Sequence, residues 1–151
     1  MDIKYRFCAF EEFERVFRDD HPGRELWTDL VTARNASHIY GAEIDGQIRG
    51  AIAFDHVDHE AIDDYEDKFT LSYLDFLYVS REVRGNGIAT HLLAAAIQFL
   101  IDEGRTPIGC GFTSRKLKNC FERLPSELKE AVVSLPTILD DGHDVWDENG
   151  L

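Results

Sequence analysis

In the first half of the chain, hydrophobic residues recur first at every second position, as in a strand, and then at helical spacing. Residues 3–7 place Ile, Tyr and Phe between charged residues, which predicts a half-buried strand. Residues 10–17 then carry apolar side chains at helical spacing, and a second short helix is predicted around residues 26–30. Asp45-Gly46 separates two apolar runs, residues 39–44 and 48–54, and this pair favours the tight turn of a β-hairpin.

The second half continues the pattern of strand and helix. Residues 71–80 form the longest strand-like run, and residues 88–104 follow with two neighbouring apolar rows of a helix that Gly104 ends. A short strand over residues 107–112 and a basic amphipathic helix over residues 114–124 come next, followed by a mostly apolar run from Val132 to Leu139. The order of elements predicts an α/β fold.

Length and charge narrow the class of protein. The chain has 151 residues, of which 44% are hydrophobic and 30% charged, so we expect one domain over residues 1–151 with one hydrophobic core. The formal net charge of -13 repels phosphate backbones and anionic lipid surfaces. Nucleic acid and membrane are therefore not expected as partners, whereas a cationic substrate or a basic protein surface is favoured. The oligomeric state is left open.

Cysteine usage and the chain start point to a reducing compartment. Cys8, Cys110 and Cys120 show neither a disulfide framework nor zinc-finger spacing. Charged residues interrupt the first positions, and no stretch of 18 apolar residues occurs, so we expect a cytoplasmic protein without a membrane span. His56 and His59 lie among carboxylates, but we interpret this segment as a solvated connection and expect no metal site.

A glycine-rich turn between a strand and a helix carries the strongest chemical signal. Arg84-Gly85-Asn86-Gly87-Ile88-Ala89 stands where backbone N–H groups and a helix dipole can hold an anionic phosphate. Glycine at two positions lets a ligand approach the backbone, and Arg84 adds planar charged donors. The turn is neither a dinucleotide fingerprint, since residue 90 is Thr90 and the next strand ends without an acidic residue, nor a P-loop, since no Gly-Lys-Ser or Gly-Lys-Thr occurs.

The segment from Leu77 to Leu93 resembles the acetyl-CoA-binding motif of the GNAT N-acetyltransferase superfamily. The family's pattern of Arg or Gln, two residues, Gly, one residue, and Gly or Ala is matched by Arg84, Gly87 and Ala89. The match is close over residues 71–104, and the order of elements fits more loosely over residues 3–124. The resemblance implies a mixed, mostly antiparallel sheet of the GNAT type, splayed where the cofactor enters and flanked by helices.

The resemblance also implies where acetyl-CoA, as cosubstrate, would bind. The backbone of Leu77, Tyr78 and Val79 would pair with the pantetheine arm, and the cradle of the pyrophosphate would consist of Arg84, Gly85, Asn86, Gly87, Ile88 and Ala89. Four basic residues against one acidic residue between positions 113 and 124 would either meet another phosphate of coenzyme A or form a solvated helix face.

Proton handling is predicted at the strand before the motif. Family members place a base four or six residues before the final Val of that strand, which corresponds here to Asp75 and Tyr73. Strand alternation predicts that both share a face with Leu77 and Val79, and Asp75 is preferred because a carboxylate in an apolar strand requires a reason. The family's usual proton donor is a Tyr, but this chain has Phe121 at that position, so the general acid is left unassigned.

Together these features predict an N-acetyltransferase that passes the acetyl group directly to a primary amine. Direct transfer is preferred because no Cys or Ser pairs recognisably with a His. Seven carboxylates between residues 55 and 67 suggest a cationic acceptor, either a protein lysine or a polyamine-like molecule. Two alternatives stay open: a GNAT-like module that binds acyl-CoA without catalysis, and an acidic interaction protein that mimics nucleic acid.

Overall fold

The computed structural model describes residues 1–20, 36–56, 72–110 and 115–134. The elements run in the order β1 (Ile3–Phe7), α1 (Phe10–Asp20), β2 (His38–Ile44), β3 (Gln47–His56), β4 (Ser72–Val79), the short 3-10 helix η1 (Arg81–Val83), α4 (Ile88–Asp102), β5 (Ile108–Cys110), α5 (Arg115–Glu122), α6 (Ser126–Ala131) and β6 (Val132–Ser134). The helix predicted around residues 26–30 and the acidic stretch after His56 lie outside the described residues.

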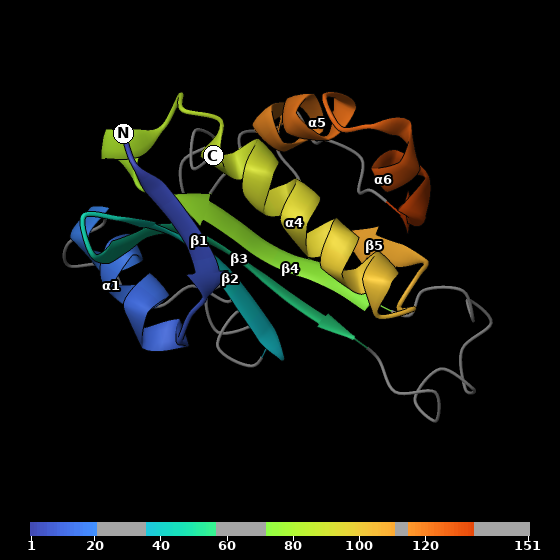
Figure 1. Ribbon diagram of the computed structural model, residues 1–151, viewed down its shortest axis with the longest axis horizontal. Coiled ribbons are helices and arrows are strands. Elements are labelled where there is room, and N and C mark those ends of the chain that lie inside the picture. The colour runs from blue at the N-terminus through green and yellow to red at the C-terminus, as the bar shows by residue number, and fades with distance from the viewer. Residues whose placement is uncertain (21–35, 57–71, 111–114, 135–151) are drawn as a thin grey trace.

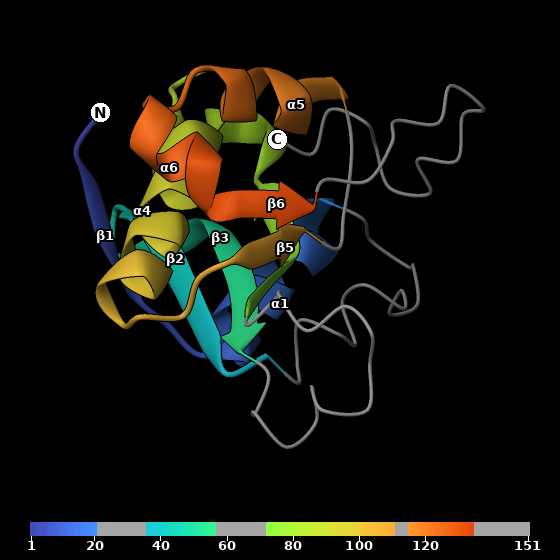
Figure 2. The same cartoon turned by 90° about the vertical axis from the view of Figure 1, so that its right-hand side faces the viewer.

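The described strands form one sheet in the order β1-β2-β3-β4-β5-β6. The first four strands pair antiparallel, and β5 and β6 then pair parallel. Helix α1 covers one face of this sheet, and α4 with α5 and α6 covers the other (Figures 1 and 2). The predicted mixed, mostly antiparallel sheet flanked by helices is confirmed.

Most predicted elements are present where the sequence placed them. The hairpin turn has Asp45 at φ 53° and Gly46 at φ 80°, the positive angles that a two-residue turn requires. Helix α4 ends with Gly104 at φ 68°, as the glycine predicted. Helix α6 was not predicted, because its six residues bury only Leu128 and so carry no helical pattern.

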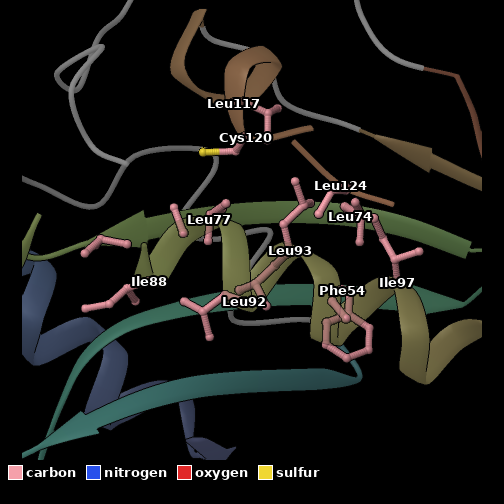
Figure 3. Close-up of a cluster of buried hydrophobic side chains, with 14 of the residues drawn as sticks. Phe54, Leu74, Leu77, Ile88, Leu92, Leu93, Ile97, Leu117, Cys120 and Leu124 are labelled. Atoms are coloured by element: carbon pink, nitrogen blue, oxygen red, sulfur yellow. The ribbon is translucent and has the colours of Figure 1, made fainter. Parts of the chain in front are cut away.

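The larger core lies between the sheet and α4. The two apolar rows of α4 pack on side chains from β2, β3 and β4, with Phe54 fully buried between them. Leu117 and Cys120 of α5, together with Leu124 just after it, also belong to this core (Figure 3). The buried residues of α4 run from Ile88 to Leu100, so this core includes the first turn of the helix as well as its last.

The smaller core lies between the sheet and α1. Phe13 and Phe17 are buried against Phe76 and Tyr78, which alternate along β4 with the residues that face α4. Strand β4 is therefore covered on both faces, as expected of a central strand. Within the described residues no helix has the length and apolar character needed to cross a membrane, and the three cysteines are free thiols.

A β-bulge interrupts β4 at Asp75. Ala53 on β3 pairs with Phe76, but the next residue, Phe54, pairs with Leu74, so Asp75 has no opposite residue on β3. Leu74 consequently joins Leu77 in the larger core, although the two are three residues apart. A bulge re-aims side chains and bends a strand, and here it coincides with the end of the recorded pairing between β4 and β5 at Leu74 and Cys110.

Candidate functional site: the open edge of strand β4 and the turn before helix α4

The edge of β4 that faces away from β3 has no strand partner beyond Leu74 in the part of the chain that the structure describes. The N–H of Ser80 donates to the carbonyl of Arg49 at 2.7 Å, which makes these two residues a hydrogen-bonded antiparallel pair. The pattern alternates, so the peptide groups of Leu77 and Val79 point away from β3. Apart from the Val79 carbonyl, which accepts a hydrogen bond from Arg84, they form a ladder edge that an extended, amide-containing ligand can join.

The turn that follows β4 is held by its own side chains. Arg84 Nε donates to the carbonyl oxygen of Val79 at 2.9 Å, and its guanidinium lies 5.4 Å from the centre of the Tyr78 ring. Asn86 Nδ2 donates to the carbonyl oxygen of Val83 at 2.8 Å. The side chains of Arg84 and Asn86 thus shape the turn, and their predicted role in cofactor binding stays a prediction.

Two glycines give the turn its backbone path. Gly85 and Gly87 have φ values of 85° and 75°, a region that other residues rarely adopt. A Cβ at either position would have no other atom within 4 Å, so glycine is required here by the backbone angle rather than by crowding within the protein. The open space lies over the backbone, where the sequence predicts the phosphate.

A pocket of about 270 Å³ opens at this point between the start of α4 and the end of α5. Gly85, Gly87, Ile88, Ala89 and Thr90 line one side. Ile88, Ala89 and Thr90 are the first three residues of α4, whose N–H groups have no acceptor within a helix. Since the side chains of Ile88 and Ala89 are buried, these residues can act on a ligand only through their backbone.

The other side of the pocket is lined by Asn119, Cys120 and Arg123. Arg123 was part of the basic segment that sequence analysis left open between a phosphate contact and a solvated face, and the structure brings it to the pocket. Asn119 and Thr90 were not predicted. A helical projection of residues 115–123 would have grouped Asn119 with Arg123, because they are four residues apart.

The bulge changes the predicted geometry of the two candidate bases. Leu74 packs in the larger core with Leu77 and Val79, so alternation places Tyr73 on the opposite face, toward α1. The prediction that Tyr73 shares a face with Leu77 is therefore wrong, because a bulge inserts one residue into the alternation. Asp75 is the bulge residue itself, and its side chain lies outside what the structure describes.

Tyr73 has a carboxylate opposite it that sequence analysis did not select. Asp55 on β3 pairs directly with Tyr73 on β4, and side chains of such a pair lie on the same face of the sheet. The Tyr73 side chain is 41% exposed, and Asp55 is half-buried. The two groups therefore bring a hydroxyl and a carboxylate together beside the bulge, on the face toward α1.

Tyr78 connects this region to the end of α1. Its hydroxyl donates to Asp20 Oδ2 at 2.6 Å, and the N–H of Arg81 donates to the same oxygen at 2.9 Å. Burial, and next the hydrogen bond to Asp20, raise the pKa of Tyr78 far above its usual range. Tyr78 therefore stays protonated, and its side chain is directed away from the open edge of β4.

Cys8 and Phe121 are poorly suited to act as nucleophile and proton donor. Burial raises the pKa of the Cys8 thiol to about 12, so it carries almost no thiolate at neutral pH. Phe121 packs against the larger core from α5 and has no proton to donate. Among the described residues no group of three or more metal-ligating side chains occurs, and the segment after His56 lies outside them.

Comparisons with known proteins identify the family of this chain. Residues 5–124 match the family described as "Acetyltransferase (GNAT) family". The chain belongs to this family, whose members are N-acetyltransferases that use acetyl-CoA, and the predicted family and enzyme class are thereby confirmed. No curated protein matches the chain at a significant level.

Solved structures show the same fold at low identity. An aminoglycoside acetyltransferase from an uncultured soil metagenomic sample, in complex with sisomicin, has 17% identity and a TM-score of 0.58 over 82% of this chain and 88% of that chain. A polyamine N-acetyltransferase of Drosophila melanogaster, which forms N-acetylagmatine, has 16% identity and a TM-score of 0.58 over 81% of each chain. AAC(6')-Iy, in complex with the bisubstrate analogue CoA-S-monomethyl-acetylneamine, has 17% identity and a TM-score of 0.55 over 79% of this chain and 85% of that chain.

Proposed function

We propose that the protein transfers the acetyl group of acetyl-CoA directly to a primary amine of a cationic acceptor. The observation that carries this proposal is the pocket between the first turn of α4 and Arg123, which lies at the end of the open edge of β4. An anion-binding helix start beside an unpaired strand edge suits a ligand with a diphosphate and an amide-containing arm.

In this proposal the two parts of acetyl-CoA meet different elements. The diphosphate accepts hydrogen bonds from the N–H groups at the start of α4 and faces Arg123, while the pantetheine arm follows the peptide groups of Leu77 and Val79. The thioester then lies toward the bulge at Asp75. The complex of AAC(6')-Iy with a CoA-containing bisubstrate analogue supports the assignment of the cofactor to this fold.

The chemistry requires an amine without its proton. A base removes one proton from the ammonium, the nitrogen attacks the thioester carbonyl carbon, and the C–S bond breaks as the C–N bond forms. We assign the base to Asp75, with Tyr73 as the second candidate, because both belong to β4 at or next to the bulge. Coenzyme A leaves as a thiolate, and the surplus proton of the attacking nitrogen passes through water to that thiolate, since Phe121 cannot supply one.

The cationic nature of the acceptor rests on charge. The chain has a net charge of -13, seven carboxylates stand between residues 55 and 67, and Asp55 lies beside Tyr73 on the face toward α1. Such a field concentrates cations and speeds their encounter with the protein. The similar structures include enzymes for aminoglycosides and polyamines, which are polycationic amines. We also retain the cytoplasm as the proposed location.

The test combines cofactor binding with turnover. Calorimetry with acetyl-CoA is followed by a thiol-release assay with spermidine, agmatine, a lysine-rich peptide and the singly charged ethanolamine at low and high salt. We expect binding, turnover of the polycations above that of ethanolamine, and rates that fall as salt rises, because the Debye length falls from about 10 Å at 0.1 M to about 3 Å at 1 M. Absence of acetyl-CoA binding would refute the proposal and favour an acidic interaction protein.

Two variants separate catalysis from binding. Asp75→Asn is expected to lower turnover by about 10² to 10⁴ without changing acetyl-CoA affinity, while the exposed Asp102→Asn serves as a control with the same chemical change. Changing Asp63, Asp64, Glu66 and Asp67 to amides is expected to raise the acceptor KM and reduce the salt dependence. Binding of acetyl-CoA without turnover of any amine would favour the non-catalytic module, which Phe121 at the donor position makes the second candidate.

A further inference from the structure

Asp20 is the last residue of α1 that the structure describes, and it follows another acidic residue, Asp19. Its hydrogen bonds connect this helix to the end of β4 and the start of η1.

Within the described residues, the hydrogen bonds of Asp20 reach the end of β4 and the start of η1. Asp20 Oδ2 accepts the hydroxyl of Tyr78 at 2.6 Å and the N–H of Arg81 at 2.9 Å, and the Asp20 carbonyl oxygen accepts Arg81 Nη1 at 3.3 Å. Ser80, the residue before η1, makes no side-chain capping hydrogen bond. A carboxylate from a distant helix therefore caps the first N–H of η1.

The same carboxylate acts on the turn through Tyr78. The Tyr78 ring is 1% exposed and lies beneath the guanidinium of Arg84, which in turn donates to the Val79 carbonyl. A cation over an aromatic face is held by the ring's quadrupole, so the position of the ring sets the position of Arg84. Rotation of Tyr78 would thus change both the side chain and the backbone that border the turn.

We propose that Asp20 is a positioning residue for the acyl-CoA site: from the end of α1 it fixes Tyr78 and the start of η1, and thereby holds the turn from Arg84 to Gly87 in the shape that receives the diphosphate. This inference rests on the proposed function of that turn. Asp20 touches neither cofactor nor acceptor in this arrangement. Its effect falls on the part of coenzyme A that carries the diphosphate and spares the reacting thioester.

The test compares two acetyl donors that differ in the diphosphate. Acetyl-CoA has it and S-acetylpantetheine lacks it, so loss of the turn's shape lowers kcat/KM for the first donor only. We expect Asp20→Ala to reduce kcat/KM for acetyl-CoA about tenfold, the effect of one hydrogen bond to a charged group, and for S-acetylpantetheine less than twofold. A general loosening of the fold would lower both values together, and that result would overturn the proposal.

Conservative variants make the assignment specific. Asp20→Asn keeps an oxygen that can accept both hydrogen bonds, so it is expected to restore most of the loss seen with Asp20→Ala. Tyr78→Phe removes one hydrogen bond and keeps the ring beneath Arg84, and the double variant with Asp20→Ala is expected to lose no more than Asp20→Ala alone. Glu14→Gln, which removes a carboxylate that pairs with Arg18 on the same helix, is the matched control.

Each outcome separates this inference from the proposed function. If the unmodified protein does not bind acetyl-CoA, the proposed function fails. If it binds and Asp20→Ala leaves the ratio of the two donors unchanged, only the role of Asp20 fails. Should Asp20→Ala not fold, Tyr78→Phe gives the same comparison of donors, and equal losses of kcat/KM with both donors would again overturn the proposal.

Discussion

Substitution of Gly87 tests the phosphate site with an internal control, because α4 has a glycine of similar geometry at its other end. Gly87 precedes the helix at φ 75°, Gly104 follows it at φ 68°, and a Cβ at either would have no other atom within 4 Å. Alanine therefore meets the same left-handed backbone at both positions, which costs roughly 1–2 kcal/mol. Both variants are expected to lower Tm by about 2–4 °C for each kcal/mol in a chain of this size.

Only Gly87 borders the pocket, so only Gly87 variants are expected to affect acetyl-CoA. Gly87→Gln and Gly87→Glu add side chains of almost equal size that differ by one charge. At about 5 Å from a phosphate charge and an effective dielectric constant of about 20, the carboxylate of Gly87→Glu is repelled by about 3 kcal/mol. This corresponds to a Kd about 100-fold weaker than that of Gly87→Gln.

The thermal stability of the two variants is expected to rank in the opposite order to their affinity for coenzyme A. A negative charge at the start of a helix stabilises it by about 0.3–1 kcal/mol, so Gly87→Glu should unfold at a slightly higher temperature than Gly87→Gln. Calorimetry with coenzyme A and thermal unfolding of the unliganded proteins measure the two effects separately. Equal Kd values for the Gln and Glu variants, with normal melting, would show that the diphosphate lies elsewhere.

Three further predictions concern side chains around the same region. Arg84→Ala removes the bond to the Val79 carbonyl and is expected to weaken coenzyme A binding by about 1.5–3 kcal/mol, or roughly 10- to 150-fold, in calorimetry, whereas unchanged affinity would show that Arg84 does not act on the cofactor. Arg123→Glu, at the pocket, is expected to weaken binding far more than Lys118→Glu, an exposed position outside the pocket on α5; equal effects would indicate only long-range charge. His91 stacks on Tyr5 with ring centres 3.7 Å apart, and burial lowers the pKa of His91 below 6.5. The folded state therefore favours the neutral imidazole. Its contribution to the free energy of unfolding is complete above pH 6.5 and is lost as pH falls through the pKa of the folded state. His91→Phe is expected to reduce the fall in unfolding free energy between about pH 7.5 and about pH 5, and an unchanged pH dependence in denaturant unfolding would contradict this.

Where hydrophobic residues recur at a clear period, the bounds of a strand or helix could be predicted from the sequence almost to the residue. β1 begins and ends where its pattern indicates, and α1 begins where its pattern indicates, because each buries a single face and its sequence shows which face that is. The turn from Arg84 to Gly87 could also be predicted, since its glycines are required by backbone angles that leave a direct mark on the sequence. Helix α6 could not, because it buries a single leucine.

The bulge at Asp75 marks the limit of such reasoning at the site. Period-two alternation assumes one residue for each residue on the neighbouring strand, and β3 carries no feature that reveals the missing partner. The face of Tyr73 was therefore predicted wrongly, and Asp55 was grouped with solvated charges although it pairs with Tyr73. Contacts such as Asp20 with Tyr78 span 58 positions and leave no local pattern at all.

The negative charge of this chain has opposite long-range effects on the two substrates of the proposed reaction. A net charge of -13 opposes the approach of an anionic cofactor and favours that of a cationic acceptor. In the proposed function, acetyl-CoA is therefore bound by donors in direct contact, namely the helix N–H groups and Arg123 at the pocket. The amine acceptor, in contrast, gains from the field before it touches the protein. Because salt screens the field over several ångströms but weakens contact hydrogen bonds much less, the proposed function predicts that added salt lowers the acceptor rate while acetyl-CoA affinity changes little.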